Sequence, residues 1–452
     1  MSLSRGIHAA TAAILAACIW QGTAAAAGKP PSQTTQFTTT VDYVSEFYPL
    51  WLSYNQAAKT NRLAGPDRVT PAYREVVAIN DDTLYASAFL DLSAEPVVLT
   101  IPKTGVTYSI LVLDAYGDIK SVSLAAGQPG VYGLTGPNFT GTLPAGVTQV
   151  PMPLDHLLLI FRSDKYTSDG VNEVKQSRRF RAGLQLQTLS DWQQDPTGGH
   201  PTILPANVFL TSFKAVADAL IAKDPITYLQ QLQLAVAGPA SPPLTAKQQK
   251  LSDKFNSLFA KGGDMTDFAL GAKAAHALIL ADYLTHTDAN NWVHFTNIGT
   301  WRAGQDLDRS AISEFLQYGN NSEAAAYYHA FEDGTGAALD GTDPAGYVIN
   351  IPEDEIPQAK RFWSFTAYTP ETVELIRNKS HKYEIASYTP GLTYNADGSL
   401  TLYIAQQQPA GVPEANWLPV RKGPFNIMLR VYGPEGSVAK NKYVPPPIMK
   451  AQ

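Results

Sequence analysis

The sequence has a single cysteine, Cys18, among 452 residues. We expect Cys18 to be removed with an N-terminal targeting segment, which excludes disulfides, zinc–thiolate sites and a cysteine nucleophile from the mature chain. The HExxH zinc motif, the GxSxG nucleophile elbow, the P-loop and a GxGxxG turn in a βαβ unit are all missing. Hydride transfer, phosphoryl transfer and α/β-hydrolase chemistry therefore lack support.

An excess of positive charge is also missing. The formal net charge is −6, and the longest basic cluster is the short segment 178–181. Such a chain lacks the positively charged surface that binds the phosphates of nucleic acid, so we predict no nucleic-acid partner. With 44% hydrophobic and 16% charged residues, the composition is that of a globular protein with a real core, long enough for two or three domains.

Long apolar runs are rare, and none reaches the roughly 18 residues of a membrane span. Residues 1–27 are typical of a signal peptide, with Arg5, an apolar run over 9–20 and small residues at 24–27. We therefore expect a secreted or cell-envelope protein. An alternative is a bacterial lipoprotein, because residues 15–18 also fit a cleavage box that would leave a lipid anchor on Cys18.

The N-terminal third favours a β-rich domain. Residues 28–40 are polar and without periodicity, which predicts a flexible leader. Residues 41–61 have helical spacing, with a kink or break at Pro49, and we expect this helix to pack on the following sheet. Short β-rich runs separated by Gly, Pro, Asp and Asn follow, so the predicted N-terminal domain covers 41–168.

The middle and the end of the chain differ from each other. Residues 169–320 show repeated helical spacing and are predicted to be a helical connector or insert. Residues 321–452 return to strands, and the turn at 395–398 predicts a β-hairpin within 387–406. The predicted fold class is α+β, with two β-rich, sandwich- or jelly-roll-like domains joined by the helical connector.

Three residues are candidates for catalysis. Asp114 ends an apolar strand stripe and is closely followed by Tyr116, so a desolvated carboxylate with a raised pKa could act as a general acid or base. Capping of the following turn is the competing interpretation. Asp82, in the segment NDDTLY, could bind a hard cation or a sugar hydroxyl, although the same segment also fits an Asx-turn loop.

Six residues are candidates for substrate binding. Strand alternation in FNIMLRVY predicts that Arg430 shares one face with polar and sulfur-containing neighbours, where it would hold an anionic group or pair with a carboxylate across the sheet. The remaining five are polar or aromatic residues that could contact a ring or a sugar, or simply belong to the core: Asn80, Tyr85, Trp363, Tyr368 and Trp417.

No metal site is predicted, because His276, His286 and His294 are spaced by ten and eight residues, which fits no zinc motif. No cofactor is indicated. In a eukaryotic host the Asn-x-Ser/Thr acceptors Asn138, Asn320 and Asn378 would be candidates for glycosylation.

Several stretches resemble a known pair of families. NDDTLYASAFLDLSAEPVVLTIP followed by LVLDAYGD resembles the N-terminal half of secreted proteins that pair domain of unknown function 1254 with domain of unknown function 1214. FWSFTAY, TPGLTYNADGSLTLYI and KGPFNIMLRVYGP resemble the C-terminal half. The resemblance implies a mainly β fold of two domains with helices between them, and no established reaction.

Two functions remain open from the sequence. One is an exported enzyme that uses carboxylate or tyrosine acid–base chemistry on a carbohydrate or small cyclic metabolite in an inter-domain cleft. The other is a non-catalytic envelope protein that binds a glycan or another ligand. Both predict a small-molecule or glycan partner, and association into a homo-oligomer is left open.

Overall fold

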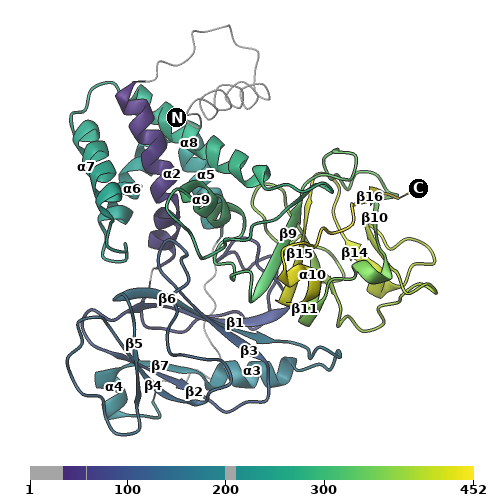
Figure 1. Cartoon of the computed structure of the whole chain (residues 1–452), viewed down its shortest axis with the longest axis horizontal. Helices are drawn as coiled ribbons and strands as arrows, with labels where there is room; N and C mark the ends of the chain where they lie inside the picture. Colours follow the sequence, from purple (N-terminus) through teal and green to yellow (C-terminus); the bar gives the residue numbers. More distant parts are fainter. Residues whose placement is uncertain (1–33, 58, 199–209, 452) are drawn as a thin grey trace.

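The computed structural model describes residues 34–57, 59–198 and 210–451 (Figure 1). The predicted signal peptide and Cys18 lie outside the described residues. Within these ranges, every helix is too short or too polar to span a lipid bilayer.

The N-terminal β part consists of two sheets that enclose a common core. One sheet has the strand order β1-β6-β3 and the other β5-β4-β2-β7. Their apolar side chains, with Phe180 of α3 (Val174–Gly183), form one buried cluster. The strands are β1 (Thr83–Asp91), β2 (Val97–Ile101), β3 (Tyr108–Leu113), β4 (Gly130–Thr135), β5 (Thr148–Pro151), β6 (His156–Asp164) and β7 (Gln185–Thr188). Because β7 pairs with β2, this part continues past the predicted boundary at residue 168.

The C-terminal β part is a second pair of sheets, with strand orders β12-β11-β15-β9-β8 and β14-β13-β10-β16. The predicted hairpin within 387–406 is wrong. The strand after the turn, β13, pairs with β10 and β14, because its apolar side chains are buried between the two sheets. The elements are β8 (Trp292–Val293), β9 (Ala325–Ala330), β10 (Tyr347–Ile351), β11 (Ala359–Tyr368), β12 (Glu384–Ala386), β13 (Leu400–Ala405), β14 (Trp417–Pro419), β15 (Asn426–Pro434), β16 (Met449–Lys450), the short α10 (Gly436–Ala439) and the 3₁₀ turns η2 (Glu353–Glu355) and η3 (Glu414–Asn416).

The helices form a separate layer beside the two β parts (Figure 1). Their N-termini are capped where the sequence has Ser, Asp or Thr: the side chains of Ser212, Asp224 and Thr245 accept hydrogen bonds from the first turns of α5, α6 and α7. The helices of this layer are α5 (Phe213–Lys223), α6 (Pro225–Ala237), α7 (Ala246–Ala260), α8 (Thr266–Thr285) and α9 (Asp306–Phe315), whereas the short α4 (Leu189–Gln194) packs on β2 and β7 of the N-terminal β part.

Helix α2 (Thr35–Gln56) runs through the middle of this layer (Figure 1). It begins at residue 35 and continues through Pro49, so the predicted leader over 28–40 is too long, and of the two alternatives at Pro49, a kink or a break, the break is wrong. It packs on α6, α7, α8 and α9. We expected this helix to pack on the following sheet. It packs mainly on other helices instead, because much of its surface is apolar and buried.

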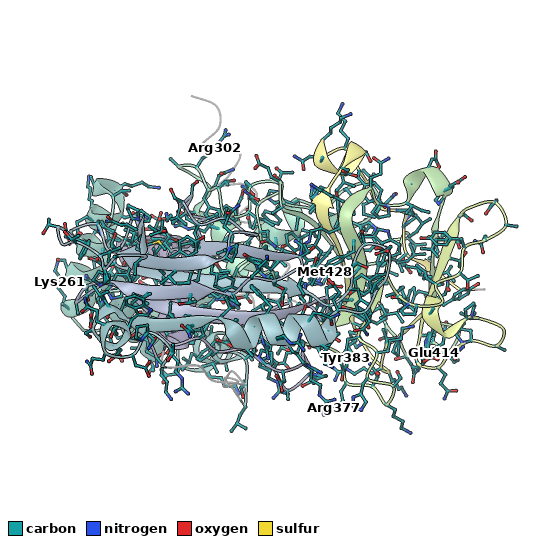
Figure 2. The ribbon with its side chains drawn as sticks, turned by 90° about the horizontal axis from the view of Figure 1, so that it is seen from below. Lys261, Arg302, Arg377, Tyr383, Glu414 and Met428 are labelled. Carbon is teal, nitrogen blue, oxygen red and sulfur yellow. The ribbon has the colours of Figure 1, made fainter. Side chains whose placement is uncertain are left out.

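Strand β15 separates two cores, as its alternation predicts. Ile427, Leu429 and Val431 lie in the C-terminal core, whereas Met428 and Tyr432 belong to a central cluster shared with the helices and the N-terminal strands. Met428 accordingly lies where the two β parts meet (Figure 2). The fold therefore directs one face of β15, including Arg430, towards the junction of all three parts.

Candidate functional site

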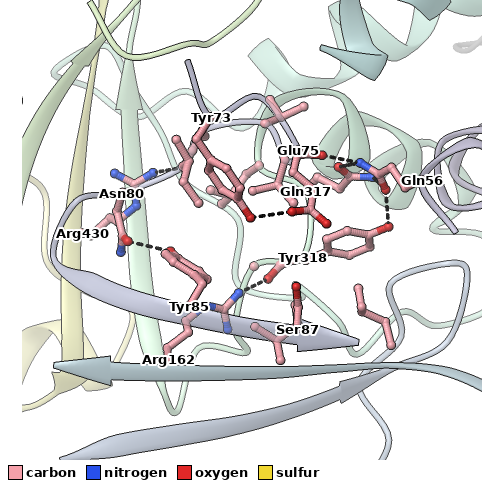
Figure 3. A pocket seen from close by; sticks show the side chains of 18 of the residues that line it. Gln56, Tyr73, Glu75, Asn80, Tyr85, Ser87, Arg162, Gln317, Tyr318 and Arg430 are labelled. Carbon is pink, nitrogen blue, oxygen red and sulfur yellow. Dashed lines mark hydrogen bonds between the residues drawn. The ribbon is translucent and has the colours of Figure 1, made fainter. Parts of the chain in front are cut away.

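A small cavity of about 50 Å³ lies at this junction (Figure 3). Its walls come from α2, the segment before β1, strands β1 and β6, the segment after α9, and strands β9 and β15. The polar residues that line it are Gln56, Tyr73, Glu75, Asn80, Tyr85, Ser87, Arg162, Gln317, Tyr318, Tyr327, Arg430 and Tyr432. Several polar side chains that converge on one small space, among apolar neighbours, indicate room for water or a small polar ligand.

Asn80 and Tyr85 connect the N-terminal wall to the C-terminal sheet. The Tyr85 hydroxyl donates to Asn80 Oδ1 over 2.5 Å, and Asn80 Nδ2 donates to the hydroxyl of Tyr432. All three side chains are buried. This chain of hydrogen bonds holds β1 and β15 on opposite sides of the cavity.

Two arginines reach the same cavity from different β parts. Arg162 Nη2 donates to the Tyr318 carbonyl over 2.8 Å, and Arg430 Nη2 donates to the Ala78 carbonyl. The residues are 7% and 1% exposed, respectively. Across the described ranges, neither guanidinium makes an ion pair with a carboxylate.

Two buried guanidinium groups without a counter-charge destabilise the folded protein. Arginine remains protonated in proteins, and a buried charge without a partner is strongly unfavourable. Arg430 Nη1 is also buried without a hydrogen-bond partner in the described structure. Of the two alternatives for Arg430, an anionic ligand therefore fits the geometry better than an ion pair across the sheet.

A phenol–carboxylate pair completes the cavity. The Tyr73 hydroxyl donates to Glu75 Oε2 over 2.7 Å (Figure 3). Burial, with the adjacent Glu75, raises the pKa of Tyr73 well above its usual value, so the phenol stays protonated. Gln56 Nε2 donates to the Glu75 carbonyl over 2.7 Å and to Gln317 Oε1 over 2.8 Å, which fixes the backbone at Glu75 against α2.

Asp82 lies behind the cavity wall. Its carboxylate accepts hydrogen bonds from Ser364 and Tyr388, each over 2.8 Å, and Ser364 is the cross-strand neighbour of Arg430. The Tyr388 hydroxyl is also 2.9 Å from Glu384 Oε1. Burial and the charge of Asp82 raise the pKa of Glu384 well above its usual value. The structure therefore brings Asp82 and Arg430 to the same junction without direct contact.

Asp114 and Tyr116 lie at a different groove, of about 470 Å³. Asp114 Oδ1 accepts from the backbone N–H groups of Tyr116 and Asp118, and Oδ2 is 2.7 Å from Lys120 Nζ. This is the turn-capping arrangement named as the alternative for Asp114. At the neighbouring Asp118, burial and the charge of Asp114 raise the pKa to about 6.

The aromatic candidates are not brought together. Trp363 belongs to the C-terminal core, whereas Tyr368 lies on the opposite face of β11, with its hydroxyl donating to the Ile79 carbonyl over 2.7 Å. Trp417 donates to the Ala405 carbonyl over 3.0 Å. Among the glycosylation candidates, Asn138 is exposed and Asn378 half-buried, but the buried Asn320 donates to the Tyr327 hydroxyl and leaves no room for a glycan.

The three histidines also lie apart. His276 lies beside Asp218 and Glu314, and His286 beside Asp282 and Asp308; each of these trios has metal-ligand spacing. His294 stacks on Tyr328. At the first trio, the Lys214 ammonium bonds to both Asp218 and Glu314, so a cation already neutralises these carboxylates.

Sequence reasoning missed Tyr73, Glu75 and Arg162. Tyr73 and Glu75 lie in an irregular segment, where no periodicity indicates the direction of a side chain. Arg162 did carry a local indication, because it is a charged residue at the end of the apolar run LLLIF in a strand.

Known protein families match the segments on both sides of the cavity. Residues 60–188 match the family model DUF1254 and residues 324–436 match the model DUF1214, each described as a protein of unknown function. The chain resembles the VPA0106 protein of Vibrio parahaemolyticus at 20% identity and a TM-score of 0.58, over 92% of this chain and 100% of that chain. A Burkholderia cenocepacia protein described as uncharacterised aligns at 14% identity and a TM-score of 0.41, over 92% of this chain and 93% of that chain. The first likeness shows a shared fold, and no curated protein matches the chain.

Proposed function

The chain belongs to the proteins that pair a DUF1254 domain with a DUF1214 domain, and we propose that it is an enzyme acting on a small carboxylate in the cavity between them. The observation that carries this proposal is the pair of buried guanidinium groups, Arg162 and Arg430, that line one cavity without a carboxylate partner in the described ranges. Arginine is suited to such a role, because its planar donors match the two oxygens of a carboxylate.

The cavity size restricts the ligand. A volume of about 50 Å³ has room for a molecule of a few heavy atoms, such as a short-chain carboxylic acid. An intact sugar ring is too large for this space. The proposal therefore keeps the acid–base chemistry expected from the sequence but replaces the carbohydrate with a smaller anion.

Glu75 would perform the proton transfer, and Tyr73 would position it. Glu75 would take a proton from the carbon next to the bound carboxylate, and the electron pair of the C–H bond would move into that carboxylate. Arg162 and Arg430 would stabilise the added negative charge, which is greatest after the proton has left. The hydrogen bond from Tyr73 holds the Glu75 carboxylate in place for this step.

Binding is tested first, by calorimetry and thermal unfolding of the purified chain with acetate, lactate and pyruvate. At a hundredfold excess over Kd, a ligand specific for the folded state stabilises it by about 2.7 kcal/mol. Arg162→Gln and Arg430→Gln should each weaken binding by at least about tenfold, whereas Arg421→Gln, at an exposed arginine, should not. If no probe binds, or all three variants bind equally, the arginine site is wrong.

Catalysis is tested separately, by NMR in D₂O, from the loss of the C–H signal next to the carboxylate of acetate and lactate. Glu75→Gln should abolish this exchange while binding persists, and Tyr73→Phe should slow it by about 10- to 100-fold. Binding through both arginines without any exchange would instead identify a carboxylate-binding protein and contradict the enzymatic step.

We also propose that the protein is exported, on the basis of the signal-peptide pattern in residues 1–27. N-terminal sequencing of protein recovered from fractionated cells distinguishes the outcomes. A mature chain that starts at Gly28 supports ordinary secretion, one that starts at a lipidated Cys18 supports an anchored form, and retention of Met1 contradicts both.

A further inference from the structure

A second, larger pocket of about 750 Å³ lies on the helical side of the molecule and shares no lining residue with the cavity described above. It is formed by α5, α8, the end of α9 and segments beside β8, β9 and β11. Its walls are mainly apolar and include Leu280, Leu284, Val293, Phe315 and Phe331. Both the volume and the composition are typical of pockets that bind small molecules with an apolar body.

One end of this pocket carries charged groups that neutralise one another. Lys214 Nζ is 2.9 Å from Asp218 Oδ2 and also bonds to Glu314. His276 Nε2 is 3.2 Å from Asp218 Oδ1 and 3.4 Å from Glu314 Oε1. Two cations thus face two carboxylates, so this end requires neither a metal nor an anionic ligand.

The remaining charge of the pocket is negative. Glu332 and Glu371 also line it, and both are exposed. Within the described ranges, neither carboxylate makes an ion pair or a side-chain hydrogen bond, and Lys214 and His276 are the only cationic residues among those that line the pocket. An entering cation therefore meets two uncompensated carboxylates beside an apolar and aromatic interior.

We propose that this pocket binds a hydrophobic amine, with its apolar body against Leu280, Phe315 and Phe331 and its ammonium group beside Glu332 and Glu371. Aromatic faces attract cations as well as apolar groups. Phe315 already has such a neighbour, because Lys214 Nζ lies 5.4 Å from its ring centre. The site is independent of the carboxylate cavity, so either proposal can fail without the other.

Titration calorimetry with hexylamine, octylamine, octanoate and octanol, at pH 7 and low salt, tests this proposal. Octylamine should bind at least about tenfold more tightly than octanoate or octanol. Each methylene that octylamine has in addition to those of hexylamine should increase the affinity about fourfold. Added salt should weaken amine binding, because the carboxylates are at the surface.

Variants separate the charge effect from the apolar effect. The double variant Glu332→Gln/Glu371→Gln should reduce octylamine affinity by about tenfold, whereas Glu323→Gln/Glu435→Gln, which removes the same charge from exposed positions elsewhere, should not. Leu280→Gln should weaken both amines, with circular dichroism to establish that the fold is intact. Absence of binding, equal or tighter binding of octanoate, or equal effects of the two double variants would overturn the proposal.

Discussion

Ser364 donates a hydrogen bond to Asp82 Oδ2 over 2.8 Å, although 282 residues separate the two in the sequence. Both side chains are completely buried. Asp82 precedes the first strand of the N-terminal β part, and Ser364 lies in the C-terminal sheet. This contact therefore joins the two matched domains directly behind the candidate site.

Removal of the Asp82 carboxylate should destabilise the protein more than removal of the Ser364 hydroxyl. Asp82→Ala leaves two buried donors, Ser364 and Tyr388, without their acceptor, for an expected loss of about 2–4 kcal/mol. Ser364→Ala removes one donor and should cost about 1–2 kcal/mol. Urea denaturation measures both, with Ser190→Ala at an exposed serine as the control. Equal losses in all three variants would contradict this account.

Glu384 should make the protein less stable as pH rises. Burial and the nearby Asp82 raise its pKa well above 4.5, so the stability it contributes is present below pH 4.5 and is lost as pH rises towards the folded pKa. Glu384→Gln removes this loss. We expect the variant to gain at least about 1 kcal/mol relative to wild type between pH 4.5 and pH 7.5. Glu414→Gln, at an exposed residue, should show no such gain. If the stability difference between Glu384→Gln and wild type is the same at pH 4.5 and pH 7.5, Glu384 does not cause the loss of stability.

The sequence was most informative where a regular local pattern decides the structure. The alternation in β15 predicted which of its side chains share a face, because a strand's side-chain period does not depend on distant contacts. The choice of partner strand does depend on them. Residues 395–398 do form a turn. The strand after it, β13, pairs with β10 and β14, so the predicted hairpin is wrong.

The candidate site was predictable only in part. Asn80, Tyr85 and Arg430 were identified because each is a polar or aromatic residue in or beside a strand, and all three line the cavity. Tyr73 and Glu75 lie in an irregular segment, where the Glu75 carbonyl accepts a hydrogen bond from Gln56 of α2, and Gln56 in turn donates to Gln317 in the loop after α9. No pattern within the sequence indicates such contacts.

His276 should contribute stability that disappears in mild alkali. Burial lowers its pKa, but hydrogen bonds and charges from Asp218 and Glu314 outweigh this effect and raise the pKa from 6.5 to about 9. The contribution is therefore complete below pH 6.5 and lost as pH rises through about 9. His276→Gln should cost up to about 3 kcal/mol at pH 6 and much less at pH 10. The exposed His381→Gln variant is the control, and a pH-independent cost for His276→Gln would contradict the charged pair.

Asp114 should affect stability and leave carboxylate binding unchanged, because its oxygens hold a turn at a different groove. Asp114→Ala should cost about 2–4 kcal/mol, and Asp114→Asn less, since its amide oxygen can still accept from the backbone. Asp397→Ala removes a similar cap from an exposed turn and should cost less. Urea denaturation and acetate calorimetry measure the two effects. Loss of acetate binding in folded Asp114→Asn would place Asp114 in the functional machinery.

A methyl group at Gly65 should disturb the cavity from outside. A Cβ at this position would lie 2.1 Å from the Tyr85 carbonyl oxygen, closer than van der Waals contact allows. Gly65→Ala must therefore displace β1 where Tyr85 lines the cavity, at an expected cost of about 1–3 kcal/mol and with weaker acetate binding. Gly105→Ala is the matched control, because nothing lies within 4 Å of its added Cβ, and it should change stability by less than about 0.5 kcal/mol. If Gly65→Ala loses stability but binds acetate normally, the position of Tyr85 does not control the anion site.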